Sequence, residues 1–183
     1  MPTMCLSYAC LQGGSSPSRR IRGGCQADKS GYIDNRHGII YNTSMNIVID
    51  TNVIVSGLQS DMGYSHKLLE ELPSREFDIS ISVPLVLEYE AQLKKHLPPE
   101  IFTEEDIDDF IDYICKIGHK TSIYYLWIPY LKDPFDDHVL ELALASQSRY
   151  IVTFNKKDFR DTEHYGIEIV KPGEFFDILG ERW

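Results

Sequence analysis

The sequence predicts an α/β fold in which a parallel sheet lies between layers of helices. Two observations predict it. From Met45 onward, short apolar or β-branched runs alternate with longer segments whose apolar residues recur at helical spacing. The first run, 47–49, is apolar without alternation, as in a strand that is buried on both faces. We therefore expect a sandwich around a mostly parallel sheet of about five strands.

The predicted elements follow one another along the chain. The expected strands span residues 46–50, 77–82, 123–127, 150–153 and 167–170. The expected helices span residues 64–72, 84–96, 103–117 and 136–148, and a last one starts at 172. Pro84 suits a first helical turn, because its missing N–H has no partner to lose there. Thr103 and Asp106 resemble a capping box, and Gly118 is a typical helix stop.

The composition is that of an ordinary globular protein. The chain has 183 residues, of which 43% are hydrophobic and 25% are charged, a length that suits one domain with a substantial core. No apolar run approaches the ~20 residues of a membrane-spanning helix, so no membrane contact is expected. The net charge of −10 excludes a generally basic nucleic-acid coat. It is compatible with an enzyme that holds nucleic acid through a metal and a local basic patch.

The first 44 residues differ from the rest. A turn-rich run over 13–20 carries neither helical nor strand spacing. Residues 1–44 have a formal charge of +3, which leaves −13 for residues 45–183. We expect 1–44 to be a disordered or over-extended segment, with Met45 as the working initiator, and 45–183 to be the folded domain. A transit peptide is the alternative that the Arg and Ser content allows.

The four cysteines do not predict a disulfide framework. Cys5, Cys10 and Cys25 fall in the first segment without any CxxC pair. A zinc site that combines them with His37 is a minor alternative. The default for such cysteine usage is a reducing cytoplasm.

Acidic and amide side chains follow several of the predicted strands. Asp50 ends the first strand, and Glu88 lies one turn into the helix after the second. Ligands of parallel sheets bind beyond the carboxyl ends of the strands, so these side chains are expected to meet at one edge. The further candidates are Asp133, Asp136 and Asp137 near the start of the helix at 136–148, and Asn155 and Asp158 after the strand at 150–153.

Converging carboxylates predict a cation. They repel one another and raise each other's pKa unless a cation joins them. Hard oxygen ligands suit Mg²⁺ or Mn²⁺. Such a site can activate a bound water and stabilise a phosphoryl group, which indicates hydrolysis of phosphodiester bonds.

Each candidate also has a purely structural interpretation. Asp50 alternatively caps a turn, and Glu88 is alternatively a solvated helix residue. Asn155 and Asp158 are alternatively ordinary turn formers, and one of the three loop acids is expected as a helix N-cap. His138, like the other histidines, shows no paired spacing and is interpreted as a structural or surface residue.

Four motifs occur in a characteristic order. They are IVIDTNV at 47–53, LEYE at 87–90, DPFDDHVLELA at 133–143 and YIVTFNKKDF at 150–159. With these motifs the chain from Met45 to about Leu179 resembles a PIN domain, of the kind found as the toxin of a toxin–antitoxin pair. The resemblance implies a Rossmann-like α/β/α sandwich and a Mg²⁺- or Mn²⁺-dependent ribonuclease.

The resemblance also implies roles for single residues. Asp50 matches the first family acid and Glu88 the second. The third comes from the loop before the helix at 136–148, with Asp137 as the first choice and Asp136 as the second. Asp50, Glu88 and Asp137 would then be the metal ligands.

The fourth family acid is an amide in this chain. Its position holds Asn155, and Asp158, three residues on, is the acid that could supply the missing charge. Asn155 can still orient a water or an acid through its carbonyl and NH₂ groups. Thr153 and Asn52 match positions that support the site by hydrogen bonds. This departure leaves the strength and the number of bound metals open.

Basic residues flank the expected site. Lys156, Lys157 and Arg160 follow the strand at 150–153, and Lys132 lies before the third acid. They could contact RNA phosphates. Solubilising surface charge is the alternative in so acidic a chain.

The leading functional hypothesis is a cytoplasmic endoribonuclease that is restrained by an antitoxin protein and pairs as a homodimer. The alternative is a binding or regulatory module that holds RNA with weakened catalysis, which Asn155 motivates. A dehalogenase-type phosphatase needs a second acid where Asn52 stands, and no GxGxxG follows the first strand to indicate a dinucleotide enzyme.

Overall fold

A computed structural model gives the structure of the protein and describes residues 32–33, 40–41, 44–123, 137–159 and 162–180. The chain divides into two units, Met1–Asn42 and Thr43–Trp183. In the first unit, β1 (Tyr32–Ile33) and β2 (Ile40–Tyr41) pair antiparallel, a ladder that the sequence pattern had not indicated. The rest of 1–43, expected to be disordered or over-extended, lies outside the described residues.

The second unit is built on a parallel sheet of five strands in the order β5-β4-β3-β6-β7. Its strands are β3 (Met45–Ile49), β4 (Phe77–Ile81), β5 (His119–Lys120), β6 (Tyr150–Val152) and β7 (Glu168–Val170). β3 lies in the centre, where Ile47 pairs with Ile79 of β4 and Ile49 pairs with Val152 of β6. All carboxyl ends therefore point toward the same edge of the sheet.

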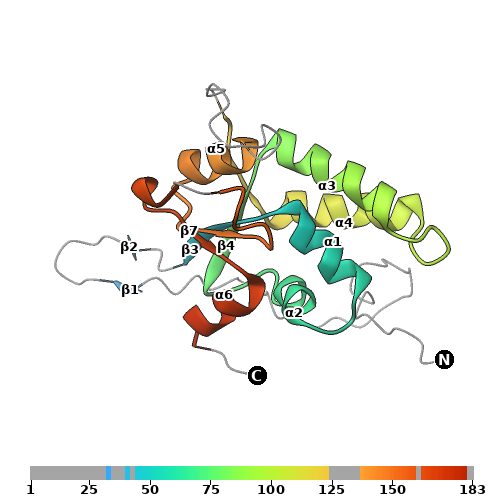
Figure 1. The fold of residues 1–183 in the computed structure, drawn as a ribbon, viewed down its shortest axis with the longest axis horizontal. Helices are drawn as coiled ribbons and strands as arrows, with labels where there is room; N and C mark the ends of the chain where they lie inside the picture. Colours follow the sequence, from blue (N-terminus) through green and yellow to red (C-terminus); the bar gives the residue numbers. More distant parts are fainter. Residues whose placement is uncertain (1–31, 34–39, 42–43, 124–136, 160–161, 181–183) are drawn as a thin grey trace, which may run out of the picture. The chain divides into compact units, whose positions relative to one another are not determined.

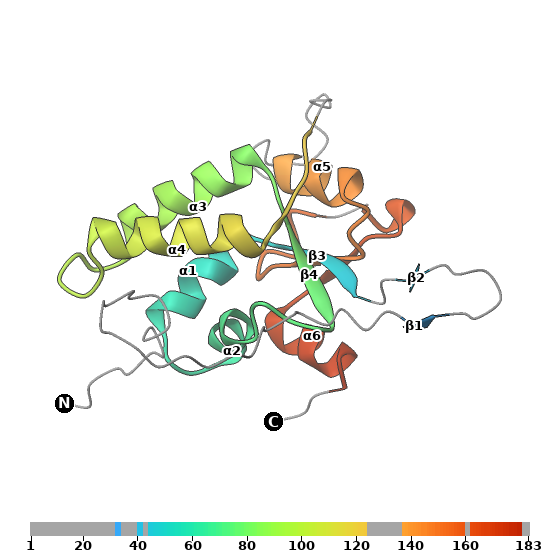
Figure 2. The same ribbon diagram turned by 180° about the vertical axis from the view of Figure 1, so that it is seen from behind.

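Helices cover both faces of this sheet. They are α1 (Thr51–Gln59), α2 (Tyr64–Glu70), α3 (Val83–His96), α4 (Glu104–Ile117), α5 (Asp137–Ala145) and α6 (Pro172–Ile178). In Figures 1 and 2, α3 and α5 lie above the sheet and α2 and α6 lie below it. The predicted three-layer α/β/α sandwich with a Rossmann-like parallel sheet is confirmed. Among the described helices, none has the length and apolar character of a membrane span.

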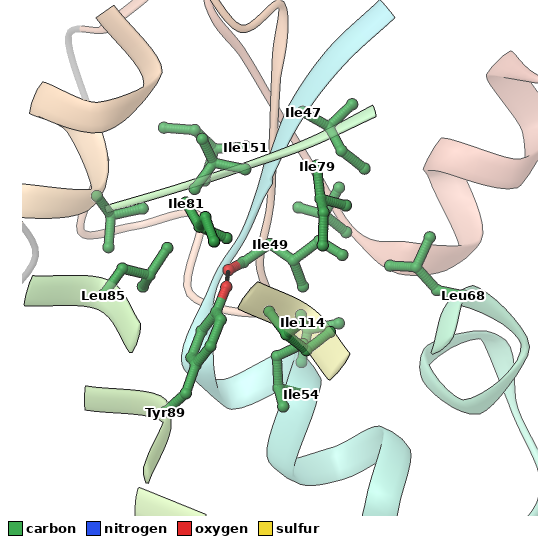
Figure 3. Packing of buried hydrophobic residues seen from close by; sticks show 14 of the residues in the cluster. Ile47, Ile49, Ile54, Leu68, Ile79, Ile81, Leu85, Tyr89, Ile114 and Ile151 are labelled. Carbon is green, nitrogen blue, oxygen red and sulfur yellow. Dashed lines mark hydrogen bonds between the residues drawn. The ribbon is translucent and has the colours of Figure 1, made fainter. Parts of the chain in front are cut away.

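The core forms around the central strands because their apolar residues point to both faces. Ile47 and Ile151 are fully buried, and Ile49 is almost so. Figure 3 shows them among aliphatic side chains that come from the sheet and from helices on both sides. Tyr89 of α3 enters the same cluster, and its hydroxyl donates a hydrogen bond to the carbonyl oxygen of Ile49. This bond connects α3 to the carboxyl end of β3.

Local signals set the ends and crossings of the helices. The predicted capping box of α4 is present: the Thr103 hydroxyl accepts from the Asp106 backbone N–H at 3.2 Å, and the Asp106 carboxylate accepts from Thr103. Gly57 of α1 lies against α2, where an added Cβ would stand 2.7 Å from the Leu69 side chain and 2.8 Å from the Ser65 carbonyl. The packing of α1 on α2 therefore requires a residue without a side chain at 57.

The structure differs from the predicted elements in two places. Helix α1 was not predicted, because its β-branched residues were not recognised as a helix directly after the first strand. The edge strand is β5, only two residues long, whereas the sequence indicated a strand at 123–127. Residues 124–127 lie outside the described residues. The expected helix at 136–148 begins at Asp137 and ends at Ala145.

Candidate active site

Asp50 is the central side chain of the candidate site. It follows β3 directly and is the N-cap of α1, where its Oδ1 accepts the backbone N–H of Thr51 at 2.7 Å. Its own backbone N–H donates to the Val152 carbonyl at 2.9 Å, so the sheet ladder runs up to this residue. Only 5% of Asp50 is exposed. The end of β3 and the start of α1 together fix this carboxylate.

Two supporting residues hold the second oxygen of Asp50. Oδ2 accepts the Thr153 hydroxyl at 2.6 Å and the Asn52 amide at 2.7 Å. The Thr153 oxygen also accepts the backbone N–H of Asn155 at 2.8 Å, which orders the chain after β6. Thr153 and Asn52, which the sequence predicts as supporting residues, are thus both hydrogen-bond donors to Asp50.

Glu88 reaches the site from α3. It is the residue before Tyr89, whose hydroxyl binds the carbonyl oxygen of Ile49 at the end of β3. Because Asp50 follows Ile49, this bond sets the second carboxylate beside the first. Glu88 Oε2 lies 2.8 Å from Nε2 of His138, with 32% and 18% of the two side chains exposed.

His138 was interpreted from the sequence as a structural or surface residue. The structure places it on Glu88 and close enough to Asp50 to act on its charge. Its position at the second residue of α5 follows from the packing of that helix against α3. No spacing rule connects residues 88 and 138, so the pair could not be found in the sequence.

The carboxylates of Asp50 and Glu88 line a cleft of about 360 Å³ that lies between α1 and α3. We call it the acid cleft. It is lined by Asp50, Thr51, Asn52, Val55, Ser56, Gln59, Glu88, Gln92, His96 and Asn155. Asp50, Asn52, Glu88 and Asn155, which the sequence analysis selected from distant motifs, meet here.

The electrostatics of Asp50 combine opposing effects. Burial raises the pKa of its carboxyl group, whereas the hydrogen bonds from Thr153 and Thr51 lower it. The negative charge of Glu88 raises this pKa further, and His138 lowers it. The net effect is an increase above the ordinary value, so a positive charge in the acid cleft would stabilise the ionised form.

Other predicted residues lie outside the lining of the acid cleft. Asp137 is the first residue of α5, and Asp158 is half-buried in the turn after β6. Lys156 Nζ lies 2.8 Å from Glu174 Oε2, so this cation is paired with α6. Lys157 is exposed. The remaining predicted residues lie outside the described residues: Lys132, Asp133 and Asp136 fall within 124–136, and Arg160 falls within 160–161.

The donor chemistry of the acid cleft fits Mg²⁺ or Mn²⁺. A carboxylate has about four acceptor positions, and the three bonds to Asp50 leave one of them. Mg²⁺ commonly binds through one or two carboxylates and keeps several waters. Within the described residues, no three Asp, Glu, His or Cys side chains converge to hold a metal ion. The described donor set therefore comprises two carboxylates, Asp50 and Glu88.

The sequence comparison decides the family. A family model of the PIN domain matches residues 46–157. The chain belongs to the PIN domain family. PIN domains are generally nucleases, and in this PIN domain the matched region contains both carboxylates of the acid cleft. A comparison with curated proteins finds no match.

Two solved structures are similar to this PIN domain. One is VapBC2 from Rickettsia felis bound to a DNA fragment from its promoter, with 18% identity and a TM-score of 0.48 over 68% of this chain and 98% of that chain. The other is VapBC-1 from nontypeable Haemophilus influenzae, with 12% identity and a TM-score of 0.48 over 70% of this chain and 98% of that chain.

Proposed function

We propose that this PIN domain, residues 45–183, is a metal-dependent endoribonuclease that hydrolyses RNA phosphodiester bonds. The observation that carries the proposal is the meeting of Asp50 and Glu88 in one polar cleft at the carboxyl edge of a parallel sheet. Hard carboxylate oxygens at this place suit Mg²⁺ or Mn²⁺. Such an ion would lower the pKa of a bound water and offset charge that develops on the phosphoryl group.

The chain's own residues have distinct tasks in this proposal. Asp50 and Glu88 hold the cation, and Asp137 is the third ligand that we propose, with Asp136 as the second choice. Thr153 and Asn52 hold Asp50 in one orientation through its Oδ2. Asp158 is the acid that we propose to compensate for the amide at the fourth family position.

A cleavage assay on the full chain tests the proposal. Single-stranded and hairpin RNAs are incubated with Mg²⁺, Mn²⁺ or EDTA, for the wild type and for Asp50→Asn and Glu88→Gln. Glu90→Gln is the matched control, because Glu90 lies on the same helix and pairs with Lys94 at 2.6 Å, outside the acid cleft. We expect metal-dependent cleavage that both cleft variants abolish and the control retains. Cleavage that survives Asp50→Asn would contradict the assignment.

Asn155 favours a second candidate, an RNA-binding module with weak catalysis. It contributes an amide to the acid cleft where the family has an acid. In this case the protein binds RNA with little turnover, and Asn155→Asp increases the cleavage rate. An Asn155→Asp variant that cleaves no faster than the wild type, while the wild type turns over rapidly, excludes this candidate.

RNA would reach the acid cleft along the chain after β6. We propose that Lys157, which is exposed, contacts a phosphate, together with Lys156 and Arg160. Lys156 would first have to leave Glu174. Lys157→Gln should weaken RNA binding and reduce its dependence on salt concentration, measured by fluorescence anisotropy. An unchanged salt dependence would indicate that Lys157 only solubilises the surface.

We also propose that the protein acts in the cytoplasm as the toxin of a toxin–antitoxin pair and forms a homodimer. The four sequence motifs that resemble toxin PIN domains support this. Co-expression with the product of a small adjacent gene should give a complex that suppresses cleavage. Light scattering should give twice the mass of one chain. A gene without such a neighbour, or a monomer at micromolar concentration, would contradict these parts and leave the nuclease proposal intact.

A further inference from the structure

The acid cleft continues well beyond its two acids. On α3, Glu88 is followed at intervals of four residues by Gln92 and His96, which places the three on one face of the helix. On α1, Ser56 and Gln59 continue the face that begins at Asn52. At about 1.5 Å per residue, the α3 face extends ~12 Å from Glu88 to His96. The proposed chemistry uses only one end of this cleft.

The far part of the cleft is polar but carries no fixed positive charge. Among the described lining residues there is neither Lys nor Arg. Phosphate groups are held in proteins mainly by such cations, by backbone N–H groups and by helix N-termini. Gln92, Gln59 and Ser56 instead offer neutral donors and acceptors. Amide side chains of this kind recognise the edges of nucleobases, and Gln pairs with adenine through two hydrogen bonds.

The two glutamines differ in their contacts. The Gln59 Nε2 atom donates to the backbone carbonyl of His96 at 3.1 Å, which connects the ends of α1 and α3. Among the described residues, no hydrogen bond reaches its Oε1. Gln92 is half-buried, and its amide has no hydrogen bond to another residue in the described part of the chain. Because Gln92 is only partly buried, water can hydrate its amide, and a ligand in the acid cleft could take the place of that water.

We infer that the far part of the acid cleft is a nucleobase subsite, in which Gln92 reads the edge of a base adjacent to the scissile phosphate. Gln59 bounds this subsite on the α1 side. A volume of about 360 Å³ for the whole cleft lies within the range of small-ligand sites. The inference rests on the proposed function and gives that function a preference for sequence, with adenine as the expected base.

The test measures binding without cleavage. The full chain with Mg²⁺ is titrated with the ribonucleoside 5′-monophosphates, which contain no phosphodiester bond, and with ribose 5-phosphate as a base-free probe. The side-chain amide signals of the glutamines are followed by NMR, and Gln92→Met identifies the signal of Gln92. Gln147→Met is the matched control, since Gln147 is exposed and lies outside the acid cleft.

We expect adenosine monophosphate to shift the Gln92 signal and ribose 5-phosphate to leave it in place. Gln92→Met should weaken nucleotide binding about tenfold, the effect of losing one good base contact, and Gln147→Met should not change it. Equal shifts with ribose 5-phosphate, or equal nucleotide affinity in Gln92→Met and wild type, would overturn the inference. A shift of the Gln92 signal with a different nucleotide supports the subsite and identifies the base of that nucleotide, instead of adenine, as the preferred one.

A parallel cleavage arm separates this inference from the proposed function. Random-sequence RNA is digested by the wild type and by Gln92→Met, and the bases flanking each cut are counted. The subsite is supported if the wild type prefers one base beside the cut and Gln92→Met loses this preference, with kcat unchanged and KM raised. Cut sites that are the same in both proteins overturn it. Nucleotide binding at Gln92 by a protein that cuts no RNA supports the subsite and contradicts the nuclease proposal.

Discussion

Replacing Tyr89 by phenylalanine tests whether one hydrogen bond sets the position of Glu88 beside Asp50. Tyr89 is 2% exposed and the packing of its ring survives in Phe, so the change removes only the hydroxyl. Burial raises the pKa of this hydroxyl well above 10, so it stays a donor at every practical pH. Its loss withdraws a partner from the buried Ile49 carbonyl and should lower the free energy of unfolding by about 2 kcal/mol.

Tyr113→Phe is the matched control. The Tyr113 hydroxyl donates to the Leu72 carbonyl at 2.5 Å, which is the same kind of bond, but Tyr113 is half-exposed and lies on α4 outside the acid cleft. Water can replace this donor, so the control should lose about 0.5–1 kcal/mol. Urea unfolding measures both losses as shifts in midpoint at constant slope. In a domain of this size, 2 kcal/mol corresponds to a fall in Tm of about 4–8 °C.

Activity separates positioning from stability. With Glu88 no longer held, kcat of Tyr89→Phe should fall about tenfold or more at a temperature where the variant is fully folded, since small displacements of reacting groups are costly. The control should keep the wild-type kcat. A Tyr89→Phe variant as active as Tyr113→Phe would refute the reasoning that this bond positions the second carboxylate.

Three further predictions concern other parts of the unit. Thr153→Val removes a bond that lowers the pKa of Asp50, so the acid limb of the kcat/KM profile should move to higher pH; an unmoved limb would contradict the proposed role of Asp50 as an ionised metal ligand. Thr103→Ala should cost about 1 kcal/mol at neutral pH. Because bonds to Thr103 hold the pKa of Asp106 below its ordinary 3.8, the carboxylate's contribution is present above that pH and lost below it. In urea unfolding, the difference between the variant and the wild type should therefore narrow in acid but not vanish, since the bond from the Asp106 backbone N–H to the Thr103 hydroxyl does not titrate. Gly57→Ala should lower the free energy of unfolding by about 1 kcal/mol, because a steric cost of about 1–3 kcal/mol exceeds the helix-propensity gain of about 1 kcal/mol. A higher urea midpoint in the variant would show instead that α2 moves to make room for the added methyl group.

The buried strands were predictable because burial on both faces leaves a simple signal. Ile47, Val48 and Ile49 form a continuous apolar run, and the parallel neighbour β6 carries a similar one. The other neighbour, β4, instead alternates Phe77, Ile79 and Ile81 with polar residues, which is also a strand pattern. β5 has only two residues, both exposed, so no pattern could reveal it. Helix α1 did carry a signal that was not used: Asp50, the candidate catalytic acid, is also an N-cap residue.

The site was predictable where the backbone alone places a residue. Asp50 and Thr153 follow adjacent strands, so their contact follows from the parallel topology. The contact of Glu88 with His138 depends on how α5 packs against α3, fifty positions apart in the chain, and no local pattern encodes it. Gln92 was not predicted as a site residue, because an amide on a helix face becomes informative only once a cleft lies in front of it.

Because Asp50 supports the fold as well as the candidate site, an acid at this position in a related chain does not by itself indicate activity. The Oδ1 atom of Asp50 caps α1 while its Oδ2 accepts hydrogen bonds from Thr153 and Asn52, so the fold needs an acceptor there even in a relative without nuclease activity. Glu88 caps no helix, and relaxed selection on catalysis would release it first. A relative that keeps an acid at 50 and lacks the one at 88 would thus be expected to retain the fold without the chemistry proposed here.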